Sequence, residues 1–93
     1  MNDVRFPEPV TLEFPWIGPR KVASSFEALE CLDQHWPEGA RGRRWRAADR
    51  ACRDALDGWR NARDARKAFL RAARRAGLVP AKTRFAAKPA WQR

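Results

Sequence analysis

The spacing of apolar residues changes once along this chain, and that change limits the fold more than any other feature of the sequence. Residues 10–14 alternate apolar and polar side chains, a period typical of a half-buried strand. Two prolines and a glycine within residues 15–19 indicate a turn, and residues 20–23 can return as a second strand. A two-stranded hairpin is only marginally stable alone, so helices are expected to cover it. Residues 1–8 are expected to form an irregular lead-in.

After residue 23 the apolar spacing becomes that of amphipathic helices. Ser24 and Glu27 have the spacing of a capping box, and Asn61 can cap a later helix. Gly58 and Gly77 stand where the residue following a helix C-terminus is expected. The three predicted helices span residues 25–35, 43–57 and 62–76.

Apolar side chains recur at helical spacing in all three segments and are predicted to form the core. They are Ala28, Leu29, Leu32 and Trp36 in the first segment, Trp45, Ala48, Ala51, Cys52, Ala55 and Leu56 in the second, and Ala62, Ala65, Phe69, Ala72, Ala73 and Ala76 in the third. The predicted fold is therefore α+β, with a short N-terminal β-hairpin packed against three α-helices in a single domain of residues 1–80. Residues 81–93 have no apolar period, so they are predicted to form a flexible basic C-terminal tail.

Short motifs occur in a characteristic order along the predicted domain. They are Pro9-Val10 in the strand, Phe26-Glu27-Ala28-Leu29 and Trp36-Pro37 around the first helix, Gly42, Ala48, Cys52, Ala55-Leu56 and Gly58 around the second, and Ala65-Arg66, Ala68-Phe69, Ala72-Ala73 and Ala76-Gly77 in the third. In this order the motifs resemble the small bacterial family catalogued as domain of unknown function 982, over residues 6–79. The resemblance implies a short hairpin followed by helices, and it brings no assigned activity, cofactor or site.

The net charge of +9 is unevenly distributed. Residues 1–40 hold three basic and seven acidic side chains, whereas residues 41–75 hold thirteen basic and four acidic ones. Residues 76–93 add four basic side chains and no acidic ones. Such a charge asymmetry is informative about binding partners rather than about the fold. It is compatible with an anionic partner and equally with an acid-to-base contact between two copies of the chain.

The outer face of the third predicted helix carries charge of one sign. Its basic residues recur at i, i+4, i+8 and i+11, and three of the four basic residues of the tail are candidates to join them. They are Arg63, Lys67, Arg71, Arg74 and the adjacent Arg75 in the helix, and Lys82, Arg84 and Lys88 in the tail. Such a row can contact successive phosphates, so nucleic acid is the favoured partner and an acidic protein the other anionic one. A merely solvated arginine face accounts for the row equally well.

The outer face of the second predicted helix differs because it mixes the two signs. Asp49–Arg53, Arg50–Asp54 and Arg53–Asp57 are spaced i,i+4 and can form ion pairs. This face is therefore expected to neutralise itself.

The alternative function is that of a protein-interaction or self-assembly domain. The acidic side of the first helix could meet the basic third helix of a second copy and give a homodimer. Trp16 and Ile17 in the turn and Trp91 in the tail have no predicted core to join, so they are candidate contact residues. The other tryptophans, Trp36, Trp45 and Trp59, are expected to pack in the core.

Neither catalysis nor metal binding is expected. His35 is the only histidine, and no glycine-rich phosphate loop follows the strand. Cys31, His35 and Cys52 could converge between two helices, but a structural zinc site normally takes four ligands, so no metal or cofactor is expected. Both cysteines are expected to be reduced thiols in a cytoplasmic protein. No apolar run is long enough to cross a bilayer, and the N-terminus lacks the apolar centre of a signal peptide.

Overall fold

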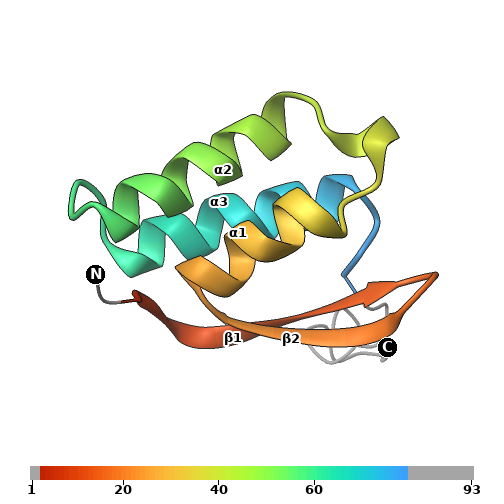
Figure 1. The fold of residues 1–93 in the computed structure, drawn as a ribbon, viewed down its shortest axis with the longest axis horizontal. Coiled ribbons are helices and arrows are strands. Elements are labelled where there is room, and N and C mark those ends of the chain that lie inside the picture. Colours follow the sequence, from red (N-terminus) through yellow and green to blue (C-terminus); the bar gives the residue numbers. More distant parts are fainter. Residues whose placement is uncertain (1–2, 80–93) are drawn as a thin grey trace, which may run out of the picture.

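The computed structural model describes residues 3–79 as an α+β fold, as the sequence predicts (Figure 1). Its elements are strand β1 (Arg5–Phe14), strand β2 (Gly18–Ser24), helix α1 (Ser25–Gln34), the 3₁₀ turn η1 (Glu38–Ala40), helix α2 (Arg43–Leu56) and helix α3 (Ala62–Arg75). Helices α1 and α3 pack on the hairpin, and α2 lies against both helices on the side away from the strands. Within the described residues no helix is long and apolar enough to cross a membrane.

The hairpin is antiparallel and buries one of its two faces. Val10 pairs with Val22, and Phe14 pairs with Gly18 beside the turn. Val10, Leu12 and Phe14 are buried while the residues between them are exposed. This alternation confirms the predicted half-buried strand, because successive side chains of a strand point to opposite faces.

The predicted irregular lead-in is wrong, since β1 already begins at Arg5. Arg5 pairs with Ser24 and Val10 with Val22, so the pairing is irregular between these two positions. Pro7 and Pro9 fall in that stretch. A proline cannot donate to a strand ladder, so it is tolerated at bulges and edges. The two prolines therefore argued against a strand in the sequence. The irregular pairing between Arg5 and Val10, which we call the β1 bulge, accommodates them.

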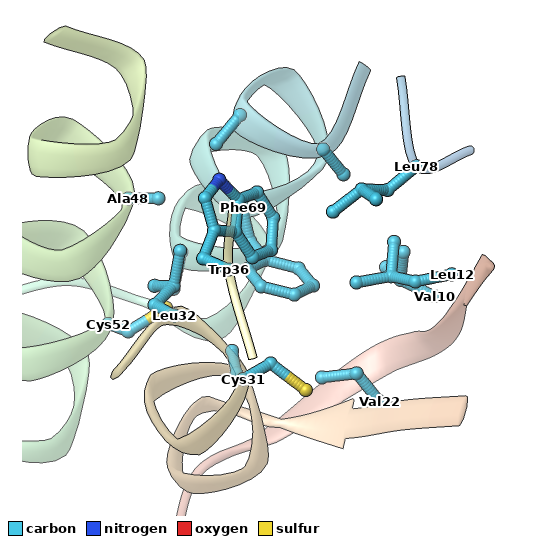
Figure 2. Close-up of a cluster of buried hydrophobic side chains, with 14 of the residues drawn as sticks. Val10, Leu12, Val22, Cys31, Leu32, Trp36, Ala48, Cys52, Phe69 and Leu78 are labelled. Atoms are coloured by element: carbon cyan, nitrogen blue, oxygen red, sulfur yellow. The ribbon is translucent and has the colours of Figure 1, made fainter. Parts of the chain in front are cut away.

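Buried aromatic rings join the N-terminal half of β1 to the helices. Phe6 is 7% exposed, and its ring centroid lies 6.2 Å from that of Phe69 on α3. The Phe69 ring lies 5.7 Å from the Trp36 ring, which in turn lies 6.4 Å from the Phe14 ring. Figure 2 shows this centre of the core, where side chains of the strands and all three helices meet.

The helix ends are built as the sequence predicts. Ser24 Oγ accepts a hydrogen bond from the Glu27 N–H at 3.2 Å, and a Glu27 carboxylate oxygen accepts one from the Ala23 N–H at 2.7 Å. The first bond is the predicted cap, whereas the second goes to the N–H of Ala23, one residue before the N-cap, and not to that of Ser24 as in a standard capping box. Asn61 caps α3 in the same way, with its side-chain oxygen 2.8 Å from the Asp64 nitrogen.

Glycines with positive φ end α2 and α3. Gly58 has a φ of 88° and Gly77 a φ of 73°, a conformation that glycine adopts without steric cost. The Leu78 N–H donates to the Ala73 carbonyl at 2.9 Å, which is the long bond of a Schellman motif. Leu78 is 3% exposed, so the chain beyond α3 turns back into the core.

The tryptophans expected in the core have three different environments. Trp36 is buried, and Trp45 is half-buried with its indole N–H donating to the Leu32 carbonyl at 2.9 Å. The Arg41 guanidinium lies 5.3 Å from the centre of the Trp45 ring and adds a cation–π contact. Trp59, however, is 83% exposed, so its predicted place in the core is wrong.

Candidate nucleic-acid interface

The five basic residues predicted on the third helix all lie on the exposed side of α3. Arg63, Lys67, Arg71, Arg74 and Arg75 are exposed. The opposite side of the same helix is buried through Ala65, Phe69, Ala72 and Ala73. With a rise of 1.5 Å per residue, the row from Arg63 to Arg74 is about 16 Å long. The structure divides this row into two parts with different neighbours.

The C-terminal part of the row joins residues from α2. Helices α2 and α3 run in opposite directions side by side, so the last turn of α3 meets the first turn of α2 (Figure 1). Arg44 lines a shallow hollow of ≈ 360 Å³ together with Arg71, Arg74 and Arg75. A second hollow, of ≈ 720 Å³, adds Arg43 and the backbone around Gly39 and Gly42. We name Arg43, Arg44, Arg71, Arg74 and Arg75 the arginine cluster.

The arginine cluster has no carboxylate partner among residues 3–79. The four ion pairs of this part of the chain join Arg20 to Glu30, Arg53 to Asp49, Arg60 to Asp54 and Arg66 to Glu8. Among residues 3–79, the C-terminal dipole of α3 is the one favourable electrostatic partner of Arg74 and Arg75. Five guanidinium groups on adjoining turns repel one another, so an anion bound among them would be stabilised.

The N-terminal part of the row borders a groove against the β1 bulge. The groove has a volume of ≈ 470 Å³, and Pro7, Glu8, Arg63, Arg66, Lys67 and Leu70 line it. Arg66 donates from Nε to the Glu8 carbonyl at 2.7 Å, and its guanidinium lies 3.8 Å from the Glu8 carboxylate. Arg66 therefore ties α3 to the bulge. Arg63 and Lys67 are left as the cations at the rim.

The outer face of α2 is only partly the ladder that was predicted. The Asp49–Arg53 pair is present at 3.1 Å. Asp54 pairs with Arg60 of the following turn at 3.6 Å, and neither Arg50–Asp54 nor Arg53–Asp57 is an ion pair in the described part of the chain. Asp54 thus pairs with Arg60 of the turn instead of with Arg50, its i,i+4 neighbour. Such an exchange of partners is easy because exposed ion pairs contribute little to stability.

The remaining predicted contact residues lie elsewhere. Trp16 and Ile17 are 53% and 46% exposed at the hairpin turn, and the Trp16 ring lies 5.6 Å from that of Phe14. The tail residues Lys82, Arg84, Lys88 and Trp91, with the predicted tail itself, lie outside the described residues. The sequence analysis missed Arg43 and Arg44, which belong to the α2 segment and reach the basic row only through the antiparallel packing of α2 on α3.

The three candidate zinc ligands have different surroundings. Cys31 points toward the hairpin, whereas Cys52 comes from α2 (Figure 2). His35 packs beside Phe14, with 6.0 Å between ring centroids. In the described part of the chain no three histidine, cysteine or acidic side chains group together as metal ligands. Both cysteines are buried and unpaired. Burial raises the pKa of the Cys31 thiol, and burial together with the Asp49 carboxylate raises the pKa of Cys52 to about 12.

Comparison with known proteins gives a family and a related fold. The model of the family described as "Protein of unknown function (DUF982)" matches residues 8–80. The chain is similar to the Agrobacterium tumefaciens protein Atu1219, solved by NMR, with 36% sequence identity and a TM-score of 0.69 over 83% of this chain and 76% of that one. No curated protein matches the chain. Because this family match covers most of its length, the chain belongs to the DUF982 family.

Proposed function

We propose that this protein is a non-enzymatic module that binds nucleic acid through the arginine cluster and the exposed side of α3. The observation that supports this most is the cluster itself. Two helices contribute five exposed or hollow-lining arginines, and no carboxylate within residues 3–79 pairs with them. A nucleic-acid backbone supplies closely spaced anions, and releasing its counterions favours binding.

The environment of the acidic residues on α1 disfavours the alternative, in which the acidic helix of one copy meets the basic helix of another. The Glu27 carboxylate accepts a hydrogen bond from the Ala23 N–H at the start of α1. The Glu30 carboxylate lies 3.4 Å from the Arg20 guanidinium. These two groups already have partners within their own chain, so a second copy would gain less from contacting them.

A salt series on an arginine variant tests the proposal. The full chain and the variant Arg71→Gln, Arg74→Gln, Arg75→Gln are titrated with a random-sequence oligonucleotide at several salt concentrations. We expect the variant to bind more weakly, and the slope of log K against log[salt] to fall by about 0.9 for each phosphate that the variant no longer neutralises. We expect the variant to keep its fold, because all three side chains are exposed and only Arg74 and Arg75 lie in the last turn of α3, where each contributes about 0.3–1 kcal/mol of helix-dipole stabilisation.

The matched control removes three charges from the other basic helix. Arg46, Arg50 and Arg53 are exposed on α2, so changing all three to Gln alters the net charge equally. If both triple variants bind equally well, or if the parent chain has no salt-sensitive affinity for nucleic acid, the proposal fails. The interaction-domain function would then take its place, with Trp16 and Ile17 as its contact residues.

We also propose a cytoplasmic location. Both cysteines are free thiols, whereas small secreted domains generally depend on disulfides. Fractionation of the producing cell, with the protein detected by antibody, tests this assignment.

A further inference from the structure

Trp59 is exposed in a way that the fold does not require. Its backbone N–H donates to the Asp54 carbonyl at 2.8 Å, which places it second after the C-cap in a Schellman motif. A hydrophobic residue at that position commonly packs on the side chain of the residue that accepts its hydrogen bond. Here the accepting residue is Asp54, which offers no apolar side chain. The indole is left 83% exposed, more than any other large hydrophobic side chain of residues 3–79. Most tryptophans bury a large apolar surface, so this exposure needs another reason.

Trp59 lies at the beginning of the basic row. Its turn joins α2 to α3, and Arg63, the first cation of the row, follows four residues later. The row then passes the groove bordered by Lys67 and Leu70 and ends in the arginine cluster. One aromatic ring, a partly apolar groove and a series of cations therefore follow one another along α3.

This order of groups resembles the way proteins hold single-stranded nucleic acid, in which cations follow the backbone and aromatic rings stack on bases. Bases inside a duplex are stacked on one another and offer only their edges, so an exposed indole can stack on a base only where the strand is single or open. The row of about 16 Å is long enough to contact several successive phosphates of one strand.

We propose that the nucleic acid bound by this protein is single-stranded, and that Trp59 stacks on one of its bases at the N-terminal end of α3. This inference rests on the proposed function, to which it adds the class of nucleic acid and an aromatic contact.

The test compares Trp59→Ala with the parent full chain by fluorescence anisotropy. The probes are a labelled oligothymidylate of about ten nucleotides and a duplex of the same length. We expect the variant to bind the single strand about 5- to 100-fold more weakly, which corresponds to the removal of one base–aromatic stack. Its salt slope stays that of the parent, because the variant still neutralises the same phosphates. Duplex affinity stays unchanged, and Trp59→Phe restores most of the single-strand binding.

Trp16→Ala provides the matched control. Trp16 is also an exposed tryptophan, but the hairpin turn that carries it lies at the opposite end of the molecule from the α2–α3 turn (Figure 1). We expect this variant to bind both probes as the parent does.

The outcomes separate this inference from the proposed function. If Trp59→Ala binds the single strand as the parent does, or if the parent prefers the duplex, the inference is wrong. The proposed function still stands in that case, provided that the arginine variant loses salt-sensitive affinity. If the parent binds neither probe, both are wrong.

Discussion

Among single residues, the two cysteines show how far burial changes chemistry. Cys31 and Cys52 are each 0% exposed, and the pKa of Cys52 is raised to about 12 by burial and by the Asp49 carboxylate. A thiol reacts as its thiolate. At pH 8 only about one Cys52 side chain in 10⁴ is ionised at that pKa, so both residues act as small apolar side chains of the core.

The cysteines are therefore expected to resist alkylation in the folded protein. Iodoacetamide at pH 8 should modify neither thiol while the chain is folded, and both after unfolding in guanidinium chloride, as counted by mass spectrometry. Because each pKa is raised by folding, the protection holds below the unfolded pKa near 9.0 and weakens as the pH rises above it. Rapid modification of either cysteine without denaturant would show that the core opens readily.

Among the elements, local signals predicted the helices well and the first strand incompletely. The Ser24 and Asn61 caps begin α1 and α3 as expected, because a cap depends on residues close together in sequence. The strand β1 extends through Pro7 and Pro9, since the pairing partner and the bulge that accommodate them come from another part of the chain. That information is not local.

The Ser24 cap provides a quantitative test at this scale. Ser24→Ala removes the hydroxyl that accepts the Glu27 N–H, so the free energy of unfolding should fall by about 1 kcal/mol, as measured by urea denaturation. Ser25→Ala is the matched control. Ser25 is equally buried, but its hydroxyl has no hydrogen-bond partner in the described part of the chain, so its removal should be neutral or slightly stabilising. Equal decreases in the two variants would contradict a specific role for the cap.

For the whole molecule, the core of residues 3–79 extends as far along the chain as Leu78. Leu78 is 3% exposed, and its carbonyl accepts a hydrogen bond from the Glu13 N–H of β1 at 2.8 Å. This hydrogen bond thus joins the segment that follows α3 to the hairpin. Within residues 3–79 the strands and all three helices contribute side chains to the core.

Truncation after Pro80 tests the predicted independence of residues 81–93. The shortened chain should unfold with a free energy within about 1 kcal/mol of that of the full chain, as for changes outside a core. Thermal and urea unfolding of both chains measure this. A much larger decrease would mean that Phe85 or Trp91 contributes to the core. The same pair of chains, titrated with oligonucleotide, reports how far Lys82, Arg84 and Lys88 add to affinity.

The amino-acid sequence was enough to predict the α+β class, the helix caps, the glycine C-termini and the exposed basic row of α3. Each depends on residues within a turn or two of one another, where hydrogen-bond geometry and hydrophobic period act locally. Only the tertiary structure shows that Arg43 and Arg44 join Arg71, Arg74 and Arg75, that Cys31 faces the hairpin, and that Trp59 stays in solvent. These outcomes depend on how α2 packs against α3 and α1, and residues far apart in sequence become neighbours only when the core is buried.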